Sequence, residues 1–307
     1  MTKKSVISGI ITAMLTPFRD NDVVDYDAVA GIVERQIGAG AGGILVAGST
    51  GEFFTLSNAE RRSLLEITTN VSGGRLPIIA NSSAPSTRET VQLSQHAQQG
   101  GAVATLVMPW SYEPMPEQAL IKLYEDVASS IDIPVVIYDA PVATRLHLTT
   151  EQRVRLGEIP GVDFIKLGSP NFVDYWDLLQ TKDRKIELVS ACDTLTFSNL
   201  AAGSPGVISG APNIFPELWV ALFNMINVEG DVRAARTIWD VLWPICHFLD
   251  RNPYVSTLKA AAAHLGNGLG EVRRPLLPLP EDAVMQLGQT LDAVANAAHQ
   301  LALPTAA

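Results

Sequence analysis

The segment VATLVMPWSYEPMPEQALIKLYEDVASSIDIPVVIYDA, residues 103–140, contains an apolar run, an amphipathic stretch and a second apolar run. The two runs, Val103–Pro109 and Val135–Ala140, have the length and composition of buried strands. The stretch between them, Glu117–Ser130, carries apolar residues at helical spacing. A strand, a helix and a further strand in this order predict two parallel strands joined by a helical crossover.

The same alternation continues in both directions along the chain. Six further strand-like runs are Gly9–Leu15, Gly43–Gly48, Pro77–Ser82, Val162–Leu167, Ile186–Ala191 and Gly206–Gly210. Helix-like segments separate them, among them Tyr26–Ala39, Ala59–Val71 and Thr87–Gln99. Eight strand–helix units in about the first 225 residues match a closed (β/α)₈ TIM barrel, a fold of the α/β class. A doubly wound open sheet is the alternative, but it is normally shorter, and no glycine-rich dinucleotide turn follows the first strand.

The C-terminal part of the chain has helical patterns and no strand pattern. Helices are expected over Val232–Phe248, Tyr254–Leu265 and Glu281–Leu301, and the proline-rich piece RRPLLPLP (273–280) separates the last two. We therefore predict that residues 1–228 form the barrel with its active site. Residues 229–307 are then a C-terminal helical extension packed on the barrel, within the same structural unit.

Composition excludes several classes of partner. A net charge of −10 disfavours nucleic acid and anionic membranes, and no apolar stretch reaches the ~18 residues of a membrane span. The first 15 residues superficially resemble a signal peptide but lack an A-x-A cleavage site, so a first strand is the preferred interpretation. Cys192 and Cys246 have no metal or redox spacing, and the five histidines are scattered. These features indicate a reduced, cytoplasmic protein without a metal site.

Functional groups of a TIM barrel gather at the carboxyl ends of its strands. The second predicted strand ends in GSTGE (48–52), the fifth in YDAP (138–141), the sixth in KLG (166–168) and the eighth in ISG (208–210). A lysine, a tyrosine and several hydroxyl groups are therefore expected to meet at one mouth of the barrel.

Lys166 is unusual because it lies in an apolar strand. Side chains alternate along a strand, so if Ile165 and Leu167 pack on the helices, Lys166 points into the barrel. Burial among apolar groups lowers the pKa of a lysine, and a neutral amine attacks ketones to form an imine. The alternative is a lysine that reaches solvent or pairs with Asp163 or Asp193.

Two further elements accompany the lysine. Tyr138, on the neighbouring strand, could transfer protons during imine and aldol chemistry, or could be an ordinary core aromatic. In GSTGE, Gly48 helps backbone N–H groups to approach a ligand, and Ser49 and Thr50 add hydroxyls that suit a small carboxylate. The alternative is an ordinary turn in which Ser49 or Thr50 caps a helix and Glu52 accepts backbone hydrogen bonds.

At these residues the sequence resembles the dihydrodipicolinate synthase / N-acetylneuraminate lyase family of class I aldolases, over nearly the whole chain. Four motifs are similar to those of the family and follow in the same order: GSTGEFFTLSNAER (48–61), YDAP (138–141), IKLGSPN (165–171) and GVIS (206–209). The resemblance implies a (β/α)₈ barrel with a helical tail, a homotetramer, small-molecule 2-oxo acid and aldehyde substrates, and no metal or other cofactor besides the covalent imine.

The resemblance also implies a role for each matching residue. Lys166 would form the imine with pyruvate or another 2-oxo acid, Tyr138 would donate and accept protons, and Ser49 would stand in the hydroxyl relay. Thr50, with nearby amides of the turn that begins at Gly48, would hold the carboxylate. Ile208 would line the pyruvate pocket through its backbone.

The departures from the family concern the second substrate. Dihydrodipicolinate synthases proper carry a tyrosine after strand four that reaches into a neighbouring subunit's site, where this chain has Ser111, followed by Tyr112. They also carry an arginine five residues after the strand-five tyrosine, where this chain has Ala143, with Arg145 two residues further on. We include Ser111 among the expected substrate-binding residues because of this position.

Other members of the family offer closer matches for some of these positions. YDAPVAT (138–144) resembles 2-keto-3-deoxygluconate aldolases, whereas Asp193 is followed by Thr194 and not by the glutamate of sialic acid lyases. The sequence therefore predicts a carbon–carbon lyase with a lysine Schiff base, similar to dihydrodipicolinate synthase without being one proper.

Three other functions remain as alternatives. A 2-keto-3-deoxy sugar acid dehydratase would use the same imine, and a non-catalytic barrel would only bind a 2-oxo acid. A metal-dependent hydrolase is disfavoured because no cluster of histidines and carboxylates lies at the strand ends. Trp219, Trp239 and Trp243 are interpreted as packing or subunit contacts, and His147 as a surface residue.

Overall fold

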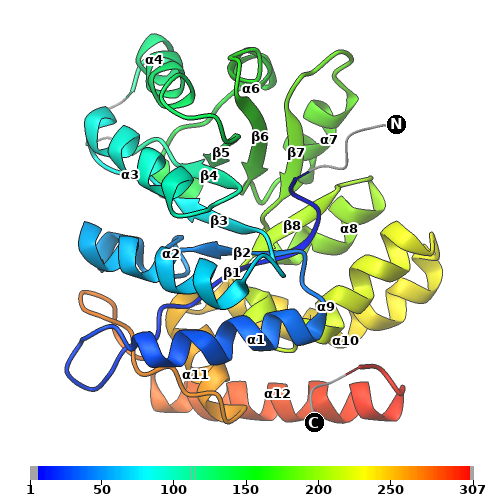
Figure 1. The fold of residues 1–307 in the computed structure, drawn as a ribbon. Helices are drawn as coiled ribbons and strands as arrows, with labels where there is room; N and C mark the ends of the chain where they lie inside the picture. The colour runs from blue at the N-terminus through cyan, green and yellow to red at the C-terminus, as the bar shows by residue number, and fades with distance from the viewer. Residues whose placement is uncertain (1–5, 111, 114, 305–307) are drawn as a thin grey trace.

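The computed structural model describes residues 6–110, 112–113 and 115–304, and its centre is a closed barrel of parallel strands (Figure 1). The strands follow one another in sequence order, and β8 pairs with β1 to close the barrel. They are β1 (Gly9–Ala13), β2 (Gly43–Val46), β3 (Ile78–Asn81), β4 (Ala104–Val107), β5 (Val135–Asp139), β6 (Val162–Leu167), β7 (Glu187–Ser190) and β8 (Gly206–Ser209). The predicted barrel is confirmed, and the open sheet is wrong.

Helices cover the outside of the barrel between successive strands. They are α1 (Val29–Ala39), α2 (Asn58–Ser72), α3 (Thr87–Gln99), α4 (Glu117–Ala128), α5 (Pro141–Thr144), α6 (Thr150–Leu156), α7 (Phe172–Gln180), α8 (Thr196–Ala201) and α9 (Pro216–Phe223). Helix α3 has the bounds predicted from the sequence, and the segment expected as one helix from Tyr26 begins with the 3₁₀ turn η1 (Tyr26–Ala28). The N-terminal apolar run forms β1, as predicted.

Alternating side chains divide the sheet into an inner and an outer face. Val136 and Phe164 belong to the apolar cluster inside the barrel. Ile137, Ile165 and Leu167 belong instead to an outer cluster that includes buried residues of α4 and α7. This arrangement confirms the prediction that Lys166, which alternates with Ile165 and Leu167, points inward.

A register shift in β6 sets this alternation. Val135 pairs with Val162, but the next residue, Val136, pairs with Phe164, so Asp163 is an extra residue in the ladder. Asp163 is exposed, whereas the rest of β6 is buried. Beyond the shift, Tyr138 pairs with Lys166, and both side chains lie on the inner face.

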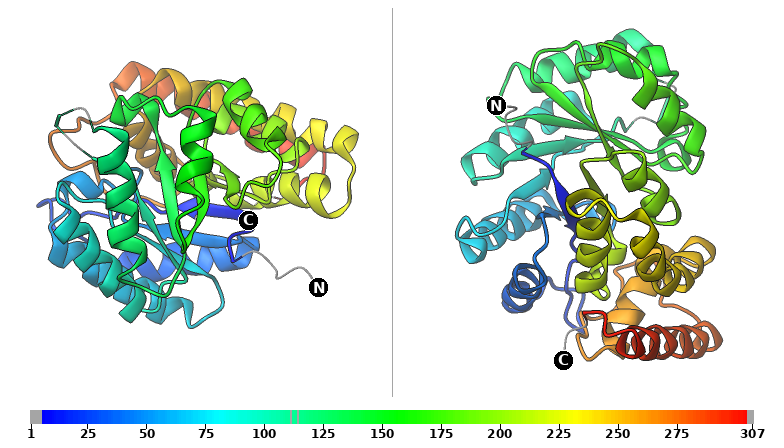
Figure 2. Two further views of the ribbon diagram at one scale, coloured as in Figure 1. Left: turned by 90° about the horizontal axis from the view of Figure 1, so that it is seen from above. Right: turned by 90° about the vertical axis from the view of Figure 1, so that its right-hand side faces the viewer.

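The C-terminal helices lie together on one side of the barrel (Figures 1 and 2). They are α10 (Val232–Arg251), α11 (Tyr254–His264) and α12 (Glu281–Gln300), close to the three predicted helices. Helix α10 contacts the turn after β7, α11 contacts the turn after β8, and α12 packs on both helices. The extension therefore reaches the mouth of the barrel, although the boundary between residues 228 and 229 stays a prediction. Within the described residues, no helix is long and apolar enough to cross a membrane.

A buried ion pair ties α6 to β5. Nε of Arg153 donates to Oδ2 of Asp139 at 2.8 Å, and both side chains are almost inaccessible to solvent. Burial raises the pKa of Asp139, and the Arg153 charge opposes that rise. Since Asp139 directly follows Tyr138 in β5, this pair also supports the end of the strand that carries the tyrosine.

We expect Arg153→Met to destabilise the protein by about 3–5 kcal/mol, because it leaves the buried Asp139 carboxylate without a partner. Combining it with Asp139→Leu should recover most of the lost stability, since both charges are then gone. Urea denaturation followed by circular dichroism measures the effect. Arg236→Met, which breaks an exposed pair with Asp240 on α10, is the control and should cost less than about 1 kcal/mol. Equal losses in Arg153→Met and the control would contradict the interpretation.

Candidate active site

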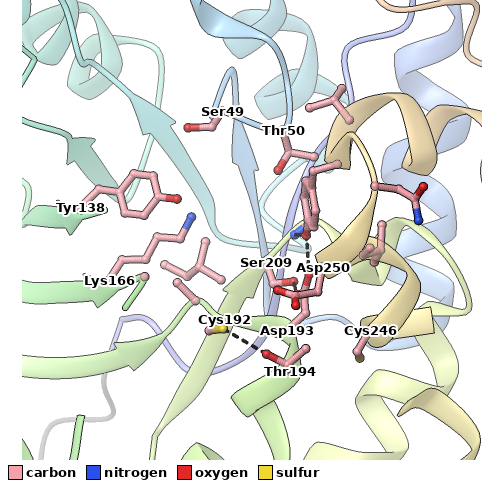
Figure 3. A pocket seen from close by; sticks show the side chains of 18 of the residues that line it. Ser49, Thr50, Tyr138, Lys166, Cys192, Asp193, Thr194, Ser209, Cys246 and Asp250 are labelled. Atoms are coloured by element: carbon pink, nitrogen blue, oxygen red, sulfur yellow. Dashed lines mark hydrogen bonds between the residues drawn. The ribbon is translucent and has the colours of Figure 1, made fainter. Parts of the chain in front are cut away.

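A cavity of about 480 Å³ opens at the carboxyl ends of β2, β5, β6, β7 and β8 (Figure 3). Its volume is in the range of small-molecule sites. The barrel contributes Ser49, Thr50, Tyr138, Lys166, residues 191–194 and residues 208–210, and the C-terminal extension contributes Cys246, Leu249, Asp250, Asn252, Tyr254 and Val255. The sequence therefore predicted the barrel side of this cavity but not the part that the extension supplies.

Lys166 and Tyr138 lie side by side in the cavity (Figure 3). They are register partners on neighbouring strands, and Nζ of Lys166 is 3.9 Å from the centre of the Tyr138 ring. Lys166 is 6% exposed, which excludes the alternative of a lysine that extends into solvent. The structure thus brings together the two residues that the sequence singled out for imine chemistry.

The surroundings change the acidity of both groups. Burial lowers the pKa of Lys166 to about 7, although the negative charge of Asp193 opposes the shift. Burial raises the pKa of Tyr138 to about 12, and a hydrogen bond with Ser49 acts in the opposite direction. A substantial fraction of Lys166 is therefore a neutral amine near pH 7, while Tyr138 keeps its proton. A nucleophilic amine beside a proton donor is the pair that imine formation requires.

The turn after β2 presents polar groups to the same cavity. Ser49 and Thr50 line it, and within the described part of the chain neither backbone N–H donates to a protein acceptor. Neither residue caps the following helix α2, whose N-terminus is capped by Ser57. The turn therefore offers hydroxyl and N–H donors to a ligand, as a carboxylate would require.

The other predicted binding residues differ in whether they line the cavity. Gly48 does not line the cavity, and a side chain there would crowd Leu45. Ile208 lines the cavity from β8 and is fully buried in the barrel interior. Gly210 allows close approach, because a Cβ at this position would lie 2.8 Å from Oγ1 of Thr50. Ser111 lies outside the described residues.

A buried carboxylate forms the wall of the cavity opposite the tyrosine. Asp193 Oδ2 accepts a hydrogen bond of 2.6 Å from the Tyr254 hydroxyl, and Oδ1 accepts one from Ser209. The Tyr254 hydroxyl in turn accepts the N–H of Gly210 at 3.2 Å. Burial raises the pKa of Asp193, and the bonds from Ser209 and Tyr254 oppose the rise.

Sequence reasoning missed Tyr254 because it lies in the C-terminal extension, more than 100 residues after Tyr138. The sequence indicated Asp193 only as a possible partner of Lys166, and not as a hydrogen-bond partner of Tyr254. The only local signal for Tyr254 is its place at the start of α11, directly after Pro253.

The charges around the cavity are few. Lys166 is the only cation among the described lining residues, whereas Asp193 and Asp250 both carry carboxylates. Arg145, two residues beyond the position of the family's substrate-binding arginine, is exposed and does not line the cavity, and His147 is exposed as well. A negatively charged second substrate thus has no guanidinium partner in the described lining.

The remaining predicted features have structural roles or lie elsewhere. Trp219 is fully buried, while Trp239 and Trp243 form part of an aromatic row along α10, outside the cavity lining. Cys192 and Cys246 line the cavity, and burial raises the pKa of both thiols. Among the described residues no group of three or more histidines, cysteines and carboxylates is placed to hold a metal ion.

Known proteins are similar to this chain in both sequence and structure. A model of the Dihydrodipicolinate synthetase family matches residues 6–294. A 4-hydroxy-tetrahydrodipicolinate synthase of Syntrophobacter fumaroxidans is 32% identical over 291 residues, 94% of this chain and 99% of the relative.

Two solved structures illustrate the structural match. The 4-hydroxy-tetrahydrodipicolinate synthase of Methylacidiphilum fumariolicum superposes with a TM-score of 0.91 at 28% identity, covering 96% of this chain and 98% of its own. The chloride-inhibited dihydrodipicolinate synthase of Acinetobacter baumannii, crystallised with pyruvate, gives a TM-score of 0.90 at 28% identity, covering 94% and 99%.

We expect the reactivity of Lys166 toward a small acylating reagent such as acetic anhydride to rise with pH through a midpoint near 7, because only the neutral amine reacts. Lys122, which is exposed and paired with Asp126, has a raised pKa and should titrate far above this range. Mass spectrometry of peptides labelled over a pH series measures both. Asp193→Asn should move the Lys166 midpoint to lower pH, because it removes the charge that favours the ammonium form. A Lys166 midpoint at or above about 10, the value of an ordinary lysine, would refute the assignment.

Proposed function

The chain belongs to the dihydrodipicolinate synthetase family, and on that premise we propose that it is a class I aldolase that forms a Schiff base between Lys166 and pyruvate. The observation that carries the proposal is a buried lysine with a pKa of about 7 beside a protonated tyrosine, on neighbouring strands of the barrel. The family and the lyase class that the sequence predicted are confirmed by the matches. Pyruvate is supported by the relative crystallised with it.

The reaction begins with the neutral amine of Lys166. Its nitrogen attacks C2 of pyruvate, the carbonyl oxygen takes a proton from Tyr138, and a carbinolamine forms. The carbinolamine hydroxyl leaves as water with a proton from Tyr138, which gives an iminium ion. The resulting tyrosinate then takes a proton from C3, which gives an enamine and restores the phenol. C3 then attacks the carbonyl carbon of an aldehyde, whose oxygen is protonated by Tyr138, and hydrolysis of the imine releases the product. Ser49, which hydrogen-bonds with the phenol, provides the relay that returns protons to Tyr138.

The turn after β2 binds the carboxylate of pyruvate in this proposal. The Thr50 hydroxyl and the backbone N–H groups of Ser49 and Thr50 act as donors, and Gly48 gives the turn its shape without lining the cavity. Ile208 closes the pocket on the β8 side. With the carboxylate held here, C2 of a three-carbon acid is directed toward the Lys166 side of the same cavity.

The second substrate is proposed to be a neutral, hydroxylated aldehyde. Asp193, Ser209 and Tyr254 offer hydrogen-bonding groups to hydroxyls, whereas the described lining offers a carboxylate no guanidinium partner. Ala143 and Arg145 do not line the cavity, so neither replaces the arginine of dihydrodipicolinate synthases proper. These features support an aldolase of this family that is not a dihydrodipicolinate synthase proper.

A sugar-acid dehydratase is the second candidate. It would use the same imine to eliminate water from a 2-keto-3-deoxy acid, and the buried Asp193, whose pKa is raised, is a group that could protonate a leaving hydroxyl. The non-catalytic alternative, a barrel that only binds a 2-oxo acid, is disfavoured by the acidity of Lys166 and Tyr138. The homotetramer and the cytoplasmic location stay predictions.

Incubation with pyruvate and sodium borohydride should attach a reduced pyruvate adduct to Lys166, because borohydride reduces the imine to a stable secondary amine. Peptide mass spectrometry locates the adduct. Lys166→Met should abolish it, and Lys122→Met, a surface control, should not change it. Labelling at another lysine, or none at all, overturns the proposal, and binding of pyruvate without an adduct favours the non-catalytic barrel.

Paired with pyruvate, a neutral hydroxyaldehyde such as glyceraldehyde should react with a kcat/KM at least about tenfold above that of succinate semialdehyde, whose carboxylate would face Asp193. Condensation is measured as the consumption of pyruvate. Cleavage of the isolated product is measured as the release of pyruvate. A higher rate with the carboxylated aldehyde contradicts the assignment of the second substrate. Conversion of a 2-keto-3-deoxy acid with its carbon skeleton intact and no pyruvate released identifies the dehydratase.

A further inference from the structure

The carboxylate of Glu52 is fully buried immediately after the turn that carries Ser49 and Thr50. Its Oε1 lies 3.0 Å from Nζ of Lys259, and its Oε2 accepts the backbone N–H of Arg273 at 2.8 Å. Glu52 therefore accepts a backbone bond, as one alternative from the sequence expected, but it also forms an ion pair across more than 200 residues of chain.

Lys259 comes from α11 and is held as firmly as its partner. It is 3% exposed, its Nζ donates to the backbone carbonyl of Glu271 at 2.7 Å, and the same nitrogen lies 4.1 Å from the centre of the Phe18 ring. A charge in such a position is stable only with its partner, because a buried ion that loses its counter-ion keeps the full cost of desolvation.

Helix α11 is thereby attached to the active site at two points. At its N-terminus, Tyr254 bonds Asp193 and the N–H of Gly210, as described above. Five residues later Lys259 pairs with Glu52. Between them, Leu258 and Thr50 both lie close to Gly210, where a Cβ would meet either side chain within 3 Å. The extension therefore joins the turn after β2 to the turns after β7 and β8.

The turn after β2 requires such support. Ala47 and Glu52, at its two ends, both have positive φ angles, 50° and 59°, although neither is a glycine. A non-glycine residue in this region costs on the order of 1–3 kcal/mol and persists only where the surroundings fix it. Glu52 thus combines a strained backbone with a buried side chain that is held by the C-terminal extension.

We propose that Glu52 and Lys259 are a positioning pair, through which the C-terminal extension fixes the Ser49–Thr50 turn in the conformation that binds the carboxylate of pyruvate. Neither residue lines the cavity, so the pair acts through the turn and not on the substrate. The inference rests on the proposed function, in which this turn holds pyruvate. It assigns a role in substrate binding to a part of the chain outside the barrel.

The double variant Glu52→Gln/Lys259→Met tests the proposal, because it removes both charges and retains approximate side-chain volume. Its thermal stability should stay near that of the wild type, since removal of a whole buried pair is often neutral, whereas either single variant leaves one charge unpaired. If the pair positions the turn, the half-saturating pyruvate concentration for adduct formation on Lys166 should rise at least about tenfold in the double variant, equivalent to about 1.4 kcal/mol. The kcat at saturating pyruvate should change less than KM, because the turn binds a carboxylate that does not react.

The controls separate this inference from the function on which it rests. Glu34→Gln, a change on α1 that breaks an exposed pair with Arg75, should leave the half-saturating pyruvate concentration unchanged. The positioning role is overturned if the double variant folds and its half-saturating pyruvate concentration is within about twofold of the wild-type value. The pair would then contribute to stability alone. If the double variant does not fold, Glu52→Asp, which keeps the charge on a shorter side chain, must raise the pyruvate requirement for the inference to hold. Absence of any adduct in the wild type would instead refute the proposed function.

Discussion

The desolvation of one amine is the constraint on which the rest of the site depends. Lys166 is 6% exposed at the mouth of a closed parallel barrel, on the inner face that it shares with Phe164 and other apolar side chains. The cost of holding a charge there lowers the pKa of the amine to about 7. The inward direction of the side chain on β6, between β5 and β7, is what places the amine in these apolar surroundings.

The negative charge of Asp193 does not cancel the lowering of the Lys166 pKa. Asp193 favours the ammonium form of Lys166, but its oxygens are engaged by Ser209 and by Tyr254 from the C-terminal extension. The carboxylate thus stays on the wall of the cavity and does not form an ion pair with the amine in the described structure. Tyr138 remains protonated for the same physical reason that a substantial fraction of Lys166 is neutral near pH 7, because burial penalises the charged form of each.

Local sequence patterns were sufficient to predict the barrel and the side of the cavity that the barrel forms. Short apolar runs predicted all eight strands, and alternation within β6 predicted the direction of Lys166, because both depend on neighbouring residues only. Tyr254 and Lys259 could not be found in this way, since their partners, Asp193 and Glu52, are distant in sequence and meet them only after α11 has packed. Gly48 was predicted to bind substrate because it lies in the motif; it does not line the cavity, so this role stays a prediction.

The extra residue Asp163 in the first half of β6 limits how the length of this strand can change during evolution. Because side chains alternate along a strand, the number of residues before Lys166 decides on which face it lies. The extra residue Asp163 shifts the register by one, and this shift puts Lys166 on the same face as Tyr138. Losing or gaining one residue here would invert the whole end of the strand and exchange the amine for Ile165 or Leu167. Length variation in evolving relatives should therefore be accommodated in the connecting loops, while the number of residues between this step and the lysine is held constant.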